Sequence, residues 1–252
     1  GLCEVAARGR RRLLTEEGLA QRYRETVNSV SPNDIATIIY TSGTTGRSKG
    51  VMLTHVNILS NVRASLQMIS MKSDDVALSF LPLSHSLERT VVYAYLCEGV
   101  TVAFAESLET IARDLRMIKP TIMTGVPRVY EKVQARVLES VAQASAIRRK
   151  IFGWAISAGW SRASRQFANQ SVPWYIRIQN LLANRMVFRK IRARTGGRLR
   201  LIVSGGAPLG ISTAEFFCAI GMPIVEGYGL TETAPVLTLN PPEAVRIGTV
   251  GK

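Results

Sequence analysis

The feature that most restricts the fold of this chain is an alternation between short β-rich runs and longer segments with helical periodicity. Strands are predicted at residues 35–40, 51–53, 76–81, 100–104, 121–124, 199–203 and 222–225. Helices are predicted between them, for example at 87–96 and 108–118. The alternation predicts an α/β fold with mixed, largely parallel sheets covered by helices on both sides. Ligands bind such sheets beyond the carboxyl ends of the strands.

Two local predictions concern the first strands. Residues 35–40 are predicted to form a buried strand because they are almost entirely apolar or β-branched. Thr54 follows the second strand and is expected to cap a helix. The helical spacing then predicts one apolar face made of Val56, Leu59, Val62, Leu66 and Ile69.

Composition excludes several classes of protein. With 46% hydrophobic and 20% charged residues, the 252-residue chain is predicted to be globular, with one large domain or two small ones. Cys3, Cys97 and Cys218 lie far apart, so we expect no disulfide framework and a reducing, cytoplasmic compartment. Two histidines without metal-site spacing argue against a zinc protein. The most apolar stretch, 91–105, is too short to span a bilayer.

The positive charge is concentrated between Arg128 and Arg200. This basic stretch holds 16 of the 32 Lys and Arg residues but only two of the 18 acidic residues. Apolar residues recur within it at helical spacing: Val141, Ile147, Ile151, Trp154, Ala158, Trp174, Ile178, Leu181 and Phe188. One interpretation is a pair of amphipathic helices that pack on the core and expose their basic faces to water. The other is a surface for an anionic partner, such as phospholipid headgroups or a phosphorylated cofactor; nucleic acid is not expected, because no recognised motif accompanies the charge.

A loop rich in glycine and hydroxyl groups follows the first predicted strand. It includes Thr41, Ser42, Gly43, Thr44, Thr45, Gly46 and Lys49. The glycines allow close approach of the backbone to a ligand, the hydroxyl and N–H groups can bind phosphate oxygens, and Lys49 adds a mobile positive charge. The spacing differs from that of the usual P-loop. A flexible surface loop is the alternative for such a composition.

This loop resembles the phosphate-binding signature of the AMP-forming adenylate synthetases, which include acyl-CoA synthetases, luciferases and peptide-synthetase adenylation domains. Residues 226–233 are similar to the family's adenine- and magnesium-binding loop, and 205–208 to its small-residue turn beside the adenine. The three segments occur in the family's order. The resemblance implies that residues 31–252 form the central part of the multi-subdomain N-terminal domain of adenylate-forming enzymes, and that 1–30 end a preceding segment.

The resemblance also implies roles for single residues. The loop from Thr41 to Lys49 would surround the β- and γ-phosphates of ATP. Thr44 and Glu232 would lie at Mg²⁺, and Thr231 would contact the α-phosphate. Tyr228 and Gly206 would frame the adenine. The full set of remaining nucleotide-binding residues is Gly206, Ala207, Pro208, Glu226, Gly227, Tyr228 and Gly229. In many relatives glutamine or asparagine stands at the position of Glu226.

Two further segments are typical of long-chain fatty acyl-CoA synthetases. These are residues 81–89 and 125–132, and the basic stretch is another feature of that subgroup. His85 is then the candidate for positioning the fatty acid carboxylate, although a lone histidine is more often structural. Its neighbours Glu88 and Arg89 could pair with each other.

The implied activity is that of a long-chain fatty acid–CoA ligase, with His85, Lys49, Thr231 and Glu232 as catalytic residues. The fatty carboxylate would attack the α-phosphate of ATP to give acyl-AMP and pyrophosphate, and the thiol of coenzyme A would then displace AMP. The implied ligands are ATP, Mg²⁺, coenzyme A and a fatty acid. A ligase for another acid, a ligase that loads a carrier protein, and a piece that only binds nucleotide are the alternatives.

The chain is expected to be a fragment. It begins at Gly1 and ends at Lys252 without a capping element, whereas relatives continue into a hinge and a small C-terminal domain with a catalytic lysine. We therefore expect little or no adenylation by these 252 residues alone. The basic stretch and a water-insoluble substrate together predict peripheral contact with an anionic membrane.

Overall fold

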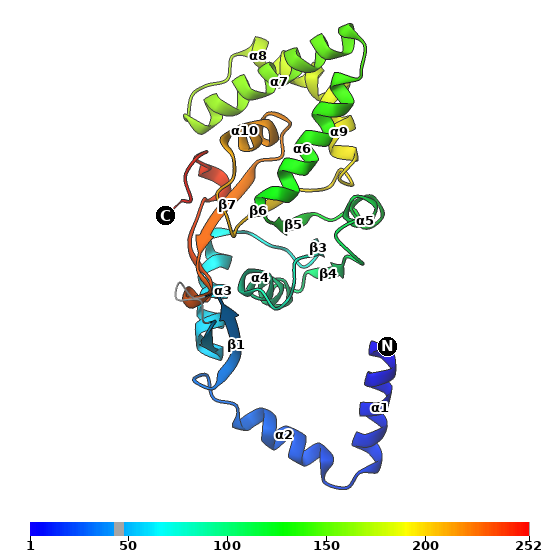
Figure 1. Ribbon diagram of the computed structural model, residues 1–252, viewed down its shortest axis with the longest axis vertical. Helices are drawn as coiled ribbons and strands as arrows, with labels where there is room; N and C mark the ends of the chain where they lie inside the picture. Colours follow the sequence, from blue (N-terminus) through cyan, green and yellow to red (C-terminus); the bar gives the residue numbers. More distant parts are fainter. Residues whose placement is uncertain (43–47, 252) are drawn as a thin grey trace.

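The computed structural model describes residues 1–42 and 48–251, and its centre is a six-stranded sheet (Figure 1). The strands are β3 (Val76–Ser79), β4 (Thr101–Phe104), β5 (Ile122–Gly125), β6 (Leu201–Ser204), β7 (Ile224–Gly229) and β8 (Val236–Leu239). Their order is β4-β3-β5-β6-β7-β8, and every pairing is parallel except that of β8 with β7. The expected mixed, largely parallel sheet is confirmed.

Helices cover both faces of this sheet because neighbouring strand residues point to opposite sides. One face packs Leu78, Met123 and Ile202 against α5 (Ile111–Ile118), α6 (Pro127–Ala142) and α10 (Ile211–Ala219). The other face packs Ala77 and Ile122 against α4 (Ser86–Cys97). Helix α3 (His55–Met68) lies beside α4 and β8, and completes the layer on that side.

The first two strands form a separate antiparallel ribbon, β1 (Ile35–Thr41) with β2 (Lys49–Thr54). The strand predicted at 35–40 is confirmed, but its predicted burial is wrong. One side of the ribbon packs on α3, while Ile38 and Tyr40 on the other side are exposed. No further layer of the described residues covers that side, so apolar content alone overestimated the burial.

Helix α3 begins as predicted, because the Thr54 hydroxyl accepts a hydrogen bond from the Asn57 N–H at 3.3 Å. Its buried face differs from the predicted one. Val62 and Ile69 are buried, but Ile58 takes the place expected for Val56 and Leu59, which are exposed. The helix packs this face on β2 and α4, and it also contacts β8 at the edge of the main sheet.

Beyond these layers, both ends of the chain contain elements that the sequence analysis did not predict. Helices α1 (Leu2–Thr15) and α2 (Leu19–Ser29) form an arm that extends from the body (Figure 1). At the other end, residues 226–229, predicted as loop, continue strand β7, and β8 was not predicted. Strand β7 is longer than its apolar run because β8 supplies hydrogen-bond partners for Gly227, Tyr228 and Gly229.

The basic stretch forms more helices than the predicted pair. After α6 come α7 (Ala146–Phe167), α8 (Trp174–Ala183), a π-helical segment (Asn184–Phe188) and α9 (Arg189–Ala193). Ala158 and Phe188 are buried as expected, but Ile147, Trp174, Ile178 and Leu181 are exposed. The helices of the basic stretch therefore pack on the core through part of this apolar set, and the rest of the set faces solvent. Within the described residues, no helix combines the length and the apolar character needed to cross a membrane.

Candidate functional site

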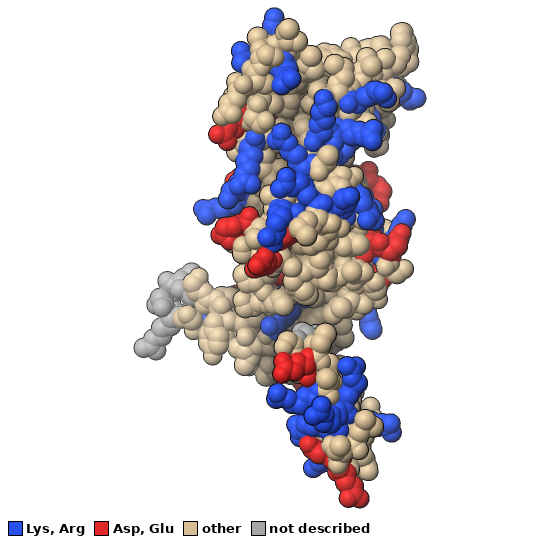
Figure 2. Space-filling model, turned by 90° about the vertical axis from the view of Figure 1, so that its right-hand side faces the viewer, with Lys and Arg blue, Asp and Glu red and all other residues tan. Residues whose placement is uncertain are grey.

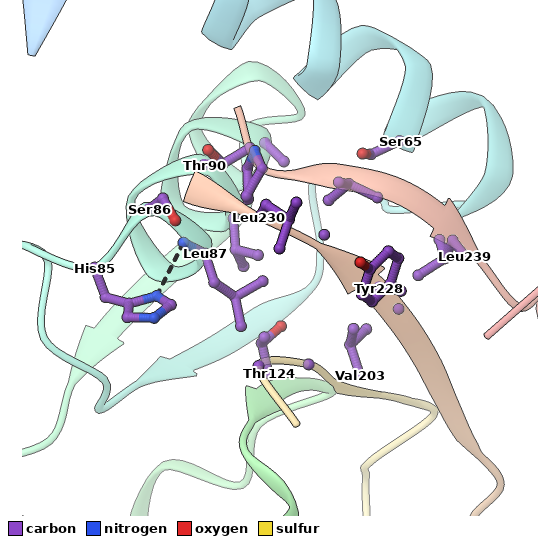
Figure 3. Close-up of a pocket in the computed structure, with 18 of the residues that line it drawn as sticks. Ser65, His85, Ser86, Leu87, Thr90, Thr124, Val203, Tyr228, Leu230 and Leu239 are labelled. Carbon is purple, nitrogen blue, oxygen red and sulfur yellow. Dashed lines mark hydrogen bonds between the residues drawn. The ribbon is translucent and has the colours of Figure 1, made fainter. Parts of the chain in front are cut away.

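A cavity of about 330 Å³ lies at the carboxyl ends of β5, β6 and β7, with α3 and α4 as its other walls (Figure 3). The residues predicted from the sequence that line it are Thr41, Ser42, His85, Gly206, Gly227, Tyr228, Gly229, Thr231 and Glu232. They come from β1, α4, the turn after β6, and β7 with the loop that follows it. The structure thus brings segments that are almost 200 residues apart into one site, where a ligand of an α/β sheet is expected.

The other predicted site residues are not in the wall of this cavity. Lys49 is exposed at the start of β2, and Ala207 and Pro208 are exposed beyond the turn. The predicted phosphate-loop residues Gly43, Thr44, Thr45 and Gly46 lie outside the described residues.

The turn after β6 needs its glycines. Gly206 has a φ of +83°, a conformation that favours glycine. At Gly205, a Cβ atom would lie 3.1 Å from Cδ2 of Leu87, so a side chain there would press on α4. The turn is held from below by Glu226, whose Oε1 accepts a hydrogen bond from the Leu209 N–H at 2.9 Å. Glu226, which was predicted to bind the nucleotide, is buried on β7 and supports the turn.

The loop after β7 presents Thr231 and Glu232 to the cavity. The Thr231 hydroxyl lies 3.4 Å from that of Ser86 on α4, and the Glu232 side chain is exposed. Tyr228 lies along the cavity wall on β7 and is 47% exposed, so it is available to a flat ligand (Figure 3). Backbone shape is again restricted, because a Cβ at Gly229 would overlap the carbonyl oxygen of Pro235.

Asn61 holds this loop in place, and the sequence analysis missed it. Its side chain on α3 donates to the Val236 carbonyl at 2.7 Å and accepts from the Val236 N–H at 3.1 Å. It also donates to the Thr233 carbonyl at 3.3 Å. The only signal in the sequence is an amide among the apolar residues of a predicted helix, which is too common to single out.

His85 caps the N-terminus of α4 at the mouth of the cavity. Its Nδ1 accepts a hydrogen bond from the Leu87 N–H at 3.2 Å (Figure 3). In a neutral ring with this geometry the proton is on Nε2, which can donate to a ligand. Because the N-terminus of α4 also carries a partial positive charge, this end of the cavity favours an anionic group such as a carboxylate.

Glu88 and Arg89 do not pair with each other, contrary to the expectation. Glu88 points into the core, where its Oε1 accepts a hydrogen bond from the Ser79 hydroxyl at 2.5 Å and its Oε2 has no partner within the described chain. Burial raises the pKa of Glu88 to about 7. Arg89 points the other way and donates to the Thr37 hydroxyl at 2.8 Å and to the Leu83 carbonyl at 3.1 Å. Together they fasten α4 to β3 and to the β1–β2 ribbon.

A second, mostly apolar cavity of about 440 Å³ lies on the other face of the sheet, between β5, α5 and α6. Met123, Leu115 and Phe217 line its interior, and Val126 lies at the end nearest the first cavity. A Cβ at Gly206 would be 3.6 Å from Cγ1 of Val126, so only small groups separate the two cavities there.

The donor set suits a magnesium ion that is bound together with phosphates. No group of three or more His, Cys, Asp or Glu side chains gathers within residues 1–42 and 48–251. Glu232 supplies one carboxylate at the mouth, near the Thr231 hydroxyl. Mg²⁺ usually keeps several waters and binds one or two carboxylates plus substrate phosphates, so these residues fit it.

Comparison with known proteins gives the family. The profile of the family described as AMP-binding enzyme matches residues 4–252. The chain is 38% identical over 233 residues to the putative fatty-acid–CoA ligase fadD11 of Mycobacterium tuberculosis. This alignment covers 91% of this chain and 41% of the relative. It is 37% identical over 209 residues to the peroxisomal long chain acyl-CoA synthetase 6 of Arabidopsis thaliana. This alignment covers 82% of this chain and 28% of the synthetase.

Solved structures agree with this relationship. The ATP-bound MatB of Rhodopseudomonas palustris has a TM-score of 0.58 at 28% identity, over 88% of this chain and 34% of MatB. The N-terminal domain of FACL13 from Mycobacterium tuberculosis, solved with an inhibitor, has a TM-score of 0.59 at 23% identity. The match covers 87% of this chain and 43% of the FACL13 chain, and it shows that the two have the same fold. The chain spans about two fifths of the length of the curated relatives that it matches first. On the match of nearly its whole length, the chain belongs to the AMP-binding enzyme family.

Proposed function

We propose that the full-length protein carrying this chain is a long-chain fatty acid–CoA ligase that forms an acyl-adenylate. The observation that carries the proposal is the convergence of Thr41–Ser42, Gly206 and the segment 227–232 on one cavity, opposite His85 at the N-terminus of α4. One side of the cavity offers hydroxyl groups, a flat ring and one carboxylate, which suit a nucleotide. The other side offers a helix N-terminus that favours anions, which suits a carboxylic acid.

In this proposal the chain binds and orients the two reactants. Tyr228 and the Gly205–Gly206 turn hold the adenine, while Thr41, Ser42 and the rest of the glycine-rich loop with Lys49 hold the phosphates. The acid lies at His85, whose Nε2 donates to one carboxylate oxygen, so that the other oxygen faces the α-phosphorus. An oxygen–phosphorus bond forms as the bond to pyrophosphate breaks, and this chemistry needs positioning and charge neutralisation rather than a protein nucleophile.

A magnesium ion held by Glu232 would neutralise charge on the phosphates. The Thr231 hydroxyl, fixed by Asn61 through the loop, would donate to the α-phosphate. In this proposal Glu226 acts through the turn, because it is buried and its Oε1 accepts a hydrogen bond from the Leu209 N–H. Ala207 and Pro208 would then act through the shape of the same turn.

The second cavity supports the proposal that the substrate has a long acyl chain. Its lining is mostly apolar, and it begins where Val126 lies close to Gly206. An acid held at His85 would direct its hydrocarbon tail past Leu87 toward this space, where burial of each methylene contributes about 0.8 kcal/mol. The names of the relatives, which are fatty-acid–CoA ligases, agree with such a substrate. Contact of the basic stretch with an anionic membrane is part of the same proposal.

The experiment that tests the proposal is ATP–pyrophosphate exchange by the full-length protein with Mg²⁺, with palmitate and acetate in parallel. Palmitate is expected to support exchange and acetate is not. Glu232→Ala should reduce the exchange about a hundredfold or more, since a charge stabiliser of the transferring group is lost. Glu243→Ala, the same change at an exposed residue outside the cavity, is the matched control and should leave the rate unchanged.

Two results would count against the proposal. Exchange with neither acid would leave nucleotide binding alone, and exchange with acetate alone would replace the long-chain substrate by a short one. Transfer of the palmitoyl group to a carrier protein but not to coenzyme A would keep the adenylation and change the acceptor.

A further inference from the structure

Helix α8 turns an apolar face to solvent. Ile176 and Ala183 are buried on the side that packs against α7. At about 100° per residue, Trp174, Ile178 and Leu181 lie on the opposite side, where they are 74%, 48% and 66% exposed. A helix that is apolar on both sides is normally buried on both. The outer face is therefore expected to have a partner.

The segment that contains α8 is strongly basic. No acidic residue lies between Glu139 and Glu215, whereas thirteen Lys and Arg residues do. Among the described residues, only Arg200 of these thirteen forms an ion pair, with Asp75. Lys and Arg accordingly gather over the upper end of the molecule, which the helices of the basic stretch form (Figure 2).

Two of these arginines lie directly at α8. Arg162 of α7 and Arg177 of α8 line one shallow recess between the two helices, together with Leu181. Arg185 follows α8 in the π-helical segment and is exposed. The apolar face is thus bordered by guanidinium groups, which pair well with phosphate oxygens.

We propose that Trp174, Ile178 and Leu181, with Arg177 and Arg185, form a surface that docks on an anionic lipid bilayer. Tryptophan and arginine suit the interface, since each combines an apolar part with a polar end that stays at the headgroups. The helix would lie in the plane of the membrane with its apolar face about 5–10 Å below the headgroup boundary. This inference rests on the membrane contact proposed for the basic stretch, but not on the ligase activity.

Charge argues for a bilayer rather than a second copy of the chain. A symmetric dimer would use the same patch on both subunits. It would therefore bring the arginines at α8 close to their own copies, with no acidic side chain of the segment 140–214 between them. An anionic bilayer supplies both the hydrocarbon and the negative charge.

The first test is sedimentation of the full-length protein with vesicles of phosphatidylcholine and phosphatidylglycerol, compared with vesicles of phosphatidylcholine alone. The protein should bind the anionic vesicles more tightly, and high salt should weaken the binding. The triple variant Trp174→Ser, Ile178→Ser, Leu181→Ser should bind about tenfold more weakly or worse. The matched control is Leu96→Ser, Phe104→Ser, Met117→Ser, at residues 63%, 60% and 73% exposed elsewhere, which should bind as the parent does.

The second test makes Trp174 of the full-length protein the reporter, with Trp154→Phe, Trp160→Phe and Phe in place of any tryptophan outside this chain. Its emission should shift to shorter wavelength and become shielded from iodide when anionic vesicles are added. Full vesicle binding by the triple Ser variant would overturn the proposal. So would a Trp174 that is shielded without lipid, which would mean that another part of the protein covers it, or a dimer that the triple Ser variant abolishes.

Palmitate-dependent exchange, measured on the same variants, separates this proposal from the ligase activity. The triple Ser variant should keep the exchange rate with detergent-dispersed palmitate while losing vesicle binding. If the parent binds vesicles without any exchange activity, the docking surface stands and the proposed ligase fails.

Discussion

Single side chains decide how α4 is held beside the candidate site. Glu88 reaches the core and Arg89 reaches the β1–β2 ribbon, although the two are neighbours in the sequence. Successive residues on a helix point about 100° apart, so a neighbouring acid and base often have different partners. The buried carboxyl has the larger energetic consequence, because an ionised group without full hydrogen bonding is costly in the core.

The pH dependence of stability should reveal Glu88. Its pKa is raised from 4.5 to about 7 by burial, so the folded state holds this proton more tightly than the unfolded state does. The stability that this proton contributes is complete below pH 4.5 and is lost as the pH rises to about 7. Glu88→Gln cannot ionise, so relative to the parent it should gain up to about 3 kcal/mol across that window.

Urea unfolding at the two ends of the window measures this difference. Glu98→Gln, at the exposed C-cap of the same helix, is the control and should show no such change. If the difference between Glu88→Gln and the parent were the same at both ends, Glu88 would have the same pKa in the folded and unfolded states.

At the scale of whole elements, close packing of α7 on α10 joins the basic stretch to the sheet. Gly159 makes this approach possible, because a Cβ there would overlap the Ala219 carbonyl and lie 2.9 Å from Phe188. The same helix has Gly153, around which nothing lies within 4 Å. The two glycines therefore have different reasons to be glycine.

Alanine at these two positions should have opposite effects. Gly159→Ala should lower the free energy of unfolding by about 2 kcal/mol or more, since α7 must move away from α10. Gly153→Ala should raise it by about 0.5–1 kcal/mol, because alanine favours the helix and meets no neighbour. Thermal unfolding followed by circular dichroism measures both, and equal shifts of the same sign would contradict this packing.

At the scale of the whole molecule, one carboxylate joins the amino ends of three strands. Asp75 precedes β3 and accepts hydrogen bonds from the Thr121 hydroxyl at 2.7 Å and from Nε of Arg200 at 2.9 Å. Thr121 precedes β5 and Arg200 precedes β6. Although burial raises the pKa of Asp75, hydrogen bonds from Arg200 and Thr121 outweigh it and hold this pKa below its usual value.

Loss of this charge should weaken the sheet as a unit. Asp75→Asn should lower the free energy of unfolding by about 1–3 kcal/mol at neutral pH. Because the pKa is lowered, the stabilisation is present above pH 3.8, and the gap between parent and variant should close as the pH falls below that value. Urea unfolding checks this, with Asp74→Asn at the exposed neighbouring position as the control. A gap that stays constant in acid would show that the charge of Asp75 is not what stabilises the sheet.

Local pattern was sufficient for much of the fold. The strands of the main sheet other than β8, the cap at Thr54 and the helices at 87–96 and 108–118 follow from periodicity and capping chemistry within a few residues. Boundaries shifted where a neighbour supplied hydrogen bonds, as β8 does for 227–229. The predicted buried face of a helix was wrong where burial depended on elements distant in the sequence, as for Val56 and for the outer face of α8.

The sequence by itself determined the family and the segments that meet at the site, because glycine, hydroxyl and carboxylate groups at fixed spacing carry their chemistry locally. Only the tertiary structure placed Glu226 under the turn, Glu88 in the core, Asn61 against the loop and Trp174 in solvent. The physical reason is that the role of a side chain depends on the groups packed around it. In a sheet where Ile122 of β5 pairs with Leu201 of β6, those groups come from segments remote in the chain, which no local pattern specifies.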